Sequence, residues 1–211
     1  MEYSKIDKLN VNPSLLGFGC MRFPKKEDGT IDEVERMLDY AIESGVTYID
    51  TAYPYHDGES EPFVGRVLKK YKREDFYLAT KLPMFKIDSL EQAKEIFEEQ
   101  MKRLDVDYVD FYLLHALNKD TWKKVIDLNI IPYCEELKKQ GRIKNFGFSF
   151  HDDYEVFEEI INYRDWDFCQ IQLNYIDTDI QAGMKGYKLT EEKNVPLVIM
   201  EPIKGGALAS L

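Results

Sequence analysis

Short apolar runs, rich in β-branched and aromatic residues, recur along the chain and alternate with longer amphipathic segments. The runs are residues 15–20, 47–52, 76–82, 108–115, 143–150, 168–175 and 197–202. Strands that are apolar on both faces are typical of parallel sheets covered by helices. The pattern therefore predicts seven buried, parallel strands.

The amphipathic segments between the runs have helical spacing. In 32–44, apolar residues fall at i, i+3, i+4, i+7 and i+8 counted from Val34, and 91–104 repeats this pattern. The ends of successive runs lie about 26 to 34 residues apart, which is the length of one strand–helix unit. Such units in series predict an α/β protein of the (β/α)8 TIM-barrel type, formed as a single domain over residues 1–211.

The two ends of this pattern are less regular. The polar lead at 3–13 predicts a short N-terminal hairpin ahead of the first strand. No candidate for an eighth strand follows the seventh run before Leu211. Because an open barrel leaves two unpaired strand edges, we interpret the chain as a barrel that is truncated after the seventh strand.

The composition narrows the class of protein. Apolar residues make up 44% and charged residues 32%, which is a globular balance. The formal charge of −11, without a basic run, argues against nucleic acid or an anionic membrane as a partner. No stretch reaches the roughly 18 to 20 apolar residues of a membrane span, and there is no secretory signal. Three cysteines without CxxC spacing fit a reducing compartment, so we expect a soluble, cytoplasmic protein.

Polar residues stand where three neighbouring runs end. In (β/α)8 barrels, residues at the carboxyl ends of strands face the active site. Asp50, Lys81 and His115 occupy such ends, and Tyr55 lies in the loop after the second run. Taken singly, each has a structural alternative, such as a helix cap for Asp50 or a satisfied core histidine for His115. Because a buried lysine needs a charged partner, the four together predict one polar cluster at the mouth of the barrel.

Several short motifs in a fixed order make the chain recognisable. They are the segments 17–22, 50–55, 80–81, 110–115, 141–144 and 147–149, with Gly58, Glu61, Gly65, Gln172, Asn174 and Tyr175. By these motifs the sequence resembles the aldo-keto reductase family over essentially the whole chain. Within the family it is similar to a bacterial branch whose longer members carry a C-terminal iron–sulfur segment.

The resemblance implies a catalytic tetrad of Asp50, Tyr55, Lys81 and His115, and NADPH-linked reduction of aldehydes and ketones to alcohols. Hydride delivery to a carbonyl carbon leaves negative charge on the oxygen, which needs a proton donor. We expect Tyr55 to be this donor, with its pKa lowered by the Lys81 ammonium. Asp50 then holds the ammonium, and a neutral His115 orients the carbonyl.

The resemblance also implies that the cofactor lies across the barrel mouth. The predicted cofactor-binding residues are Gly19, Cys20, Met21, Arg22, Asp50, Ser149, Gln172, Glu201 and Gly205. Gln170 faces the same side of its strand, but Gln172 fits the family spacing better. Phe150 stands where the family often has asparagine, and Glu201 stands near a position that often holds a stacking tyrosine. NADPH is the expected cofactor and NADH is possible, because the residues that bind the 2′-phosphate normally follow the eighth strand.

Other interpretations stay open at this point. A non-catalytic NADPH-binding subunit that regulates or binds a partner retains much of the motif. A different barrel enzyme, such as a phosphate-binding isomerase, needs a carboxylate base and leaves Tyr55 and Lys81 without a role. We expect no metal site, because Asp152 or Asp153 is better explained as the cap of a helix starting near Tyr154. The identity of the small carbonyl substrate and the oligomeric state are not specified.

Overall fold

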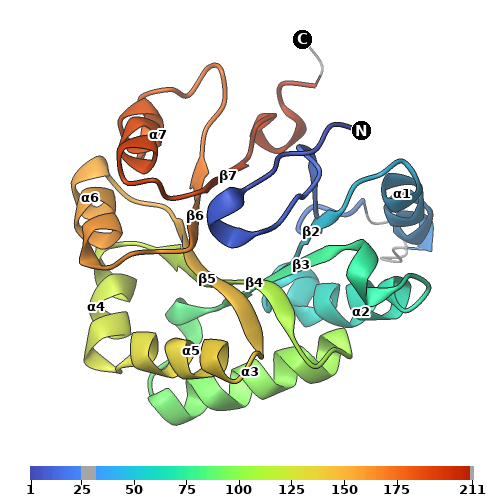
Figure 1. Ribbon diagram of the computed structural model, residues 1–211, viewed down its shortest axis with the longest axis horizontal. Helices are drawn as coiled ribbons and strands as arrows, with labels where there is room; N and C mark the ends of the chain where they lie inside the picture. Colours follow the sequence, from blue (N-terminus) through green and yellow to red (C-terminus); the bar gives the residue numbers. More distant parts are fainter. Residues whose placement is uncertain (25–31, 210–211) are drawn as a thin grey trace.

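Seven parallel strands form one curled sheet in the computed structural model, which describes residues 1–24 and 32–209 (Figure 1). The strands are β1 (Gly17–Gly19), β2 (Tyr48–Asp50), β3 (Tyr77–Leu82), β4 (Val109–Leu117), β5 (Ile143–Phe150), β6 (Phe168–Gln172) and β7 (Leu197–Met200). Each strand pairs with its neighbour in chain order, from β1 to β7. This confirms the predicted barrel type with seven strands.

The helices cover the outside of the curled sheet (Figure 1). They are α1 (Asp32–Glu43), α2 (Ser60–Leu68), α3 (Leu90–Leu104), α4 (Lys119–Asp127), α5 (Ile130–Lys139), α6 (Tyr154–Tyr163) and α7 (Gly183–Glu192). The helices predicted at 32–44 and 91–104 are confirmed to within one residue at each end. The Ser89 hydroxyl accepts a hydrogen bond from the Gln92 amide and so caps α3 at its N-terminus.

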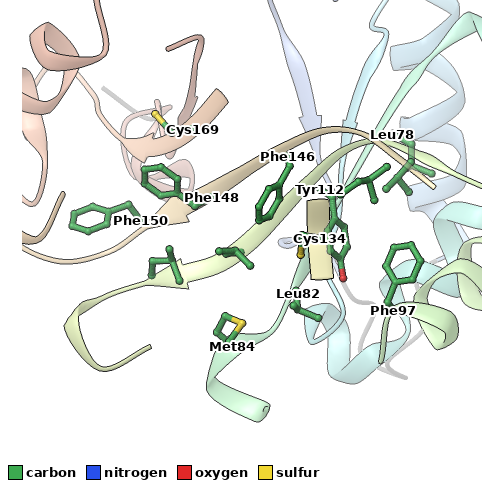
Figure 2. Close-up of a cluster of buried hydrophobic side chains, with 14 of the residues drawn as sticks. Leu78, Leu82, Met84, Phe97, Tyr112, Cys134, Phe146, Phe148, Phe150 and Cys169 are labelled. Carbon is green, nitrogen blue, oxygen red and sulfur yellow. The ribbon is translucent and has the colours of Figure 1, made fainter. Parts of the chain in front are cut away.

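Alternation along the strands separates two cores. In β4, Phe111 and Leu113 point into the barrel, whereas Tyr112 and Leu114 pack against the helices. Figure 2 shows the outer core, in which Phe146, Phe148 and Phe150 follow one another along β5. The same alternation brings Lys81 and His115 to the inner face, because Lys81 follows inward-facing Ala79 and His115 follows Leu113. The candidate site is therefore the layer of inward-facing side chains at the carboxyl ends of the strands.

The N-terminal segment folds back on itself and lies inside the curve of the sheet (Figure 1). Antiparallel bridges join Tyr3 to Ser14 and Ile6 to Val11, which confirms the predicted hairpin. Lys8 Nζ donates to the carbonyl of Trp166, just before β6, and Leu9 packs on the inner core. The hairpin thus covers the amino ends of the strands, opposite the candidate site.

The end of the run 168–175 and the predicted cap of α6 differ from the structure. The run 168–175 ends as a strand at Gln172, because the Asn174 side chain accepts hydrogen bonds from the Ile176 and Asp177 amides and forms a turn. Asp153 does occupy the position before α6, but its side chain makes no capping hydrogen bond. The Asp152 carboxylate instead accepts from the Lys119 amide at the start of α4. The helix starts at Tyr154, as predicted, but the prediction that Asp152 or Asp153 caps it through its side chain is wrong.

The two outer strands have one partner each. β1 pairs only with β2 and β7 only with β6, and among residues 1–24 and 32–209 no strand joins the two. Ile199 in β7 is 36% exposed, whereas β4 is almost entirely buried. Within those same residues the three cysteines are buried and free, and no helix is long and apolar enough to cross a membrane.

Candidate active site

Lys81 lies at the centre of the polar cluster predicted from the strand ends. Its side chain is 1% exposed and reaches from β3 to the end of β2. Lys81 Nζ donates to Asp50 Oδ1 at 2.5 Å and to the Thr51 carbonyl at 2.9 Å. A buried ammonium needs such partners, since stranding a charge costs several kcal/mol. The ion pair inferred from the sequence is therefore present.

Tyr55 and His115 complete the cluster. The Lys81 ammonium lies 5.0 Å from the centroid of the Tyr55 ring, and the Tyr55 and His115 rings meet edge to face at 5.7 Å. Tyr55 starts a short 3-10 turn after β2, and its amide donates to the Ala52 carbonyl. The four residues thus come from β2, its following loop, β3 and β4, and they lie together. The Tyr55 phenol and the Lys81 ammonium lie on the same side of the sheet, as the proton-donor role expected for Tyr55 requires.

The electrostatics of the pair differ in part from expectation. Burial favours a neutral Lys81, but the attraction of Asp50 and Tyr55 outweighs this and raises its pKa above the usual value. Burial also raises the pKa of the Tyr55 phenol; Lys81 lowers it, but not enough to reverse the shift, and Asp50 adds to the rise. Lys81 lowers the pKa of Tyr55, as expected. The prediction that this pKa lies below its usual value is nevertheless wrong, because desolvation raises it by more.

His115 is held as a neutral side chain. Burial lowers its pKa well below the ordinary range, and the charge of Lys81 and the neighbouring His151 act in the same direction. Its ring lies 5.6 Å from that of Phe85, and its Nδ1 is buried with no hydrogen-bond partner among the described residues. A neutral imidazole with a free ring nitrogen can donate to, or accept from, a small polar ligand.

Ser149 is oriented by an irregularity in β4. The register between β4 and β5 shifts between Leu114 and Leu117, and Ala116 there has φ of 52°, a left-handed conformation that a residue with a Cβ rarely adopts. The Ala116 amide donates to Ser149 Oγ at 2.8 Å. Ser149 therefore keeps its hydroxyl proton for another acceptor. Phe150 points the other way and packs on Phe157, 5.2 Å between ring centroids, so it cannot replace the family asparagine.

Gln170 contacts the cluster directly, and Gln172 does not. Gln170 Nε2 donates to Asp50 Oδ2 at 3.3 Å, and its Oε1 is buried without a partner. Gln172 is half-buried, and its Oε1 accepts from Gln181 Nε2 at 2.9 Å. Strand alternation put both amides on one face, but only the position nearer the barrel floor reaches Asp50. Gln170 is therefore part of the buried cluster, whereas Gln172 lies half-buried at the end of β6, and its assignment to the cofactor stays a prediction.

The loops after β1 and β7 meet at the open edge. Gly19, Met21 and Arg22 are exposed, and Glu201 is half-buried just after β7. A Cβ added at Gly205, where φ is +65°, would lie 3.0 Å from Arg22 Cζ, so the two predicted cofactor loops do lie together.

Cys20 has no surface with which to contact a ligand, contrary to the sequence-based prediction. It is fully buried, and burial raises the pKa of its thiol. Its amide donates to the Asp50 carbonyl, and its own carbonyl accepts from Ser60 Oγ. The backbone of Cys20 thus connects the end of β1 to the end of β2 by a hydrogen bond.

The residues present suit a nicotinamide group. His115 and Gln170 have buried polar atoms without a hydrogen-bond partner among the described residues, Ser149 keeps a free hydroxyl proton, and a Cβ at Gly19 or Gly206 would meet no neighbouring atom within 4 Å. Amide and hydroxyl groups of this kind can bind a carboxamide. No group of three or more metal-binding side chains occurs in the part of the chain that the structure describes.

Comparison with known proteins agrees with this geometry. The model of the Aldo/keto reductase family matches residues 15–211. The chain is 29% identical to the uncharacterized oxidoreductase YqkF of Bacillus subtilis over 217 residues, covering 99% of the chain and 67% of that protein. It is 25% identical to the NADH-specific methylglyoxal reductase of Escherichia coli over 186 residues, covering 78% of the chain and 54% of that protein.

A solved structure shows the same fold. The holo form of aldo-keto reductase AKR11C1 from Bacillus halodurans superposes with a TM-score of 0.75 at 29% identity, over 94% of this chain and 65% of that one. The chain spans 38% to 67% of the length of the curated relatives it matches. The order of the strands, the clustered tetrad and the family match over residues 15–211 lead to one conclusion: the chain belongs to the aldo-keto reductase family.

Proposed function

We propose that this chain carries the catalytic part of an NAD(P)H-dependent carbonyl reductase in which Tyr55 is the proton donor. The observation that supports it most is the buried Lys81 ammonium, paired with Asp50 and 5.0 Å from the Tyr55 ring. Burying an ion pair gives little net stability, so its place at the barrel mouth is better explained by chemistry.

Each of the four side chains has its own role at the substrate carbonyl. A nicotinamide cofactor, when bound, supplies the hydride. The Tyr55 hydroxyl gives its proton to the developing alkoxide, and the Lys81 ammonium stabilises the phenolate left behind. Asp50 keeps Lys81 charged and in place. Neutral His115 donates a hydrogen bond that orients the carbonyl, and its low pKa keeps it neutral at physiological pH.

The cofactor is assigned to the mouth and the open edge. We assign the carboxamide to Ser149 with Gln170 or Gln172, and the pyrophosphate to the loops that contain Arg22 and Gly205. Both NADPH and NADH are candidates, because one relative is named as NADH-specific and the residues that bind the 2′-phosphate in the family normally follow the eighth strand. The substrate class is a small aldehyde or ketone, with methylglyoxal a reasonable first test compound.

The test is the oxidation of NADPH and NADH with a panel of aldehydes, comparing the 211-residue protein with Tyr55→Phe. General acid catalysis contributes about 10² to 10⁴ in rate, so kcat should fall by at least about 100-fold. The cofactor Kd should stay within about twofold, because the phenol ring is retained. Tyr40→Phe is the control, since Tyr40 is 73% exposed on α1 and should leave turnover unchanged.

Two outcomes would contradict the proposal. Tyr55→Phe with a rate near that of the wild type would remove Tyr55 as proton donor. Tight cofactor binding with no turnover of any aldehyde by the wild type would favour a non-catalytic cofactor-binding subunit.

A further inference from the structure

A buried polar cluster lies behind the Lys81 end of β3, on the side of the strand away from the barrel mouth. The carboxylate of Glu61, on α2, is fully buried. Its Oε1 accepts from Thr80 Oγ1 at 2.6 Å and from Gln100 Nε2 at 2.9 Å, and Arg103 lies 3.5 Å from Oε2. These four residues are called the Glu61 cluster below. None of them contacts the reacting groups, and burying the polar side chains of Glu61, Thr80 and Gln100 needs a reason.

One branch of the cluster reaches Lys81. Gln100 Nε2 donates to the Lys81 carbonyl at 2.9 Å as well as to Glu61. The orientation of this amide is set from the other side, because the Tyr112 hydroxyl donates to Gln100 Oε1 at 2.8 Å. The backbone that carries the ammonium is therefore tied to α3 by a fully bonded amide.

The other branch reaches the loop that carries Tyr55. The Arg103 guanidinium lies 4.1 Å from the centroid of the Tyr53 ring, and its Nη1 donates to the Tyr53 carbonyl at 3.4 Å. The Tyr53 hydroxyl donates to Glu99 Oε2 at 2.7 Å, and Glu99 also pairs with Arg103. Tyr53 is two residues from Tyr55, so α3 fixes this loop as well.

We propose that the Glu61 cluster is a positioning device that sets the separation between the Tyr55 phenol and the Lys81 ammonium. The two groups come from different segments, and α3 is bonded to both, through Gln100 to the Lys81 carbonyl and through Arg103 to the Tyr53 carbonyl. Glu61 is the point at which the two branches meet, since it contacts both of these side chains. The inference rests on the proposed function for what the pair does, but the placement of the pair can be measured without turnover.

The attraction between phenolate and ammonium depends on their distance, so the titration of Tyr55 reports the placement. The titratable groups that act on Tyr55 include Lys81, Asp50, the buried Cys20 thiol and the buried Tyr48 phenol, and its ring contacts that of His115. All of them are left unchanged by a substitution at Glu61. Replacing Tyr55 with 3,5-difluorotyrosine makes the phenol more acidic, so that ¹⁹F NMR follows its titration while the protein stays folded.

The decisive comparison is this titration in the labelled protein with and without Glu61→Gln. If Glu61 positions the pair, Glu61→Gln lets the phenol and the Lys81 ammonium move apart. The pKa of residue 55 then rises by about half a unit or more in this variant. Removing a negative charge by itself would lower that pKa, so the sign separates positioning from direct electrostatics. An unchanged or lowered pKa would overturn the inference.

Two further variants keep the test specific. Thr80→Val removes one donor to Glu61 without a change of charge, and should also raise the pKa of residue 55, even if Glu61→Gln fails to fold. Asp110→Asn is the matched control, because Asp110 Oδ2 accepts from the Leu78 amide and pairs with Arg73 at the opposite end of β3. It should leave the titration unchanged, and a rise as large as that of Glu61→Gln would point to general loosening and overturn the inference.

Turnover is measured separately on the unlabelled proteins. Glu61→Gln should lower kcat about tenfold with little change in KM, because only proton transfer depends on the separation. A wild type without turnover contradicts the proposed function, whereas the ¹⁹F titration still decides the role of Glu61.

Discussion

The strands that carry the tetrad and the two strands at the open edge are held very differently. β2, β3 and β4 pair on both sides, and Lys81 is bonded through its side chain to β2 and through its carbonyl to α3. β1 and β7 pair on one side only, and the loops after them are exposed. The groups assigned to proton transfer are thus fixed before any ligand binds, whereas those assigned to the cofactor lie on surface loops. Pre-organisation of this kind is what electrostatic catalysis requires.

The largest effect is expected from breaking the ion pair at the centre of the tetrad. Among the described residues, Lys81→Met leaves Asp50 with the Gln170 amide as its one side-chain partner, and removing one member of a buried pair costs about 3 to 5 kcal/mol. Urea unfolding measures this loss. The double variant Asp50→Asn/Lys81→Met should be less destabilised than Lys81→Met alone, because no unpaired charge remains. If Lys81→Met were as stable as the wild type, the Asp50–Lys81 ion pair would have to be exposed to solvent.

A pair of apolar truncations compares the two regions directly. Leu114→Ala in β4 removes a fully buried side chain and should cost about 2 to 5 kcal/mol. Ile199→Ala in β7 removes a side chain that is already 36% exposed and should cost about 1 kcal/mol or less. Equal losses in the free energy of unfolding would show that the edge strand is as well packed as the centre.

The smallest effect concerns pH and His115. Its folded-state pKa lies well below the unfolded value of about 6.5, so below that pH the unfolded chain binds a proton that the folded chain does not. Stability should therefore fall as the pH drops from about 6.5, by up to about 1.4 kcal/mol per pH unit. Urea unfolding at a series of pH values measures this slope, and His115→Gln should reduce it. An unchanged slope in His115→Gln would place the effect elsewhere.

The sequence predicted those features that depend on local pattern. Apolar runs located all seven strands, and the strand-end rule brought Asp50, Lys81 and His115 together, because barrel geometry fixes where strand ends point. Alternation also explains Phe150: its neighbour Ser149 faces inward, so the phenylalanine side chain must face the helices.

Features that depend on depth within the fold were not predicted. Gln170 and Gln172 share a face, and only the position of β6 relative to β2 shows which amide reaches Asp50. The family resemblance suggested a cofactor contact for Cys20, but the residue is fully buried between β1 and α2, where its carbonyl accepts from Ser60. The net pKa of Tyr55 depends on the balance between desolvation and the Lys81 charge, which no motif specifies.

The most direct test of the central claim is a single-turnover measurement of hydride transfer from bound cofactor to an aldehyde, in the wild type and in Tyr55→Phe. If the Tyr55 phenol beside Lys81 is the proton donor, the first-order rate should fall by at least about 100-fold, with cofactor affinity retained. A rate within about threefold of the wild type, at equal cofactor occupancy, would contradict it.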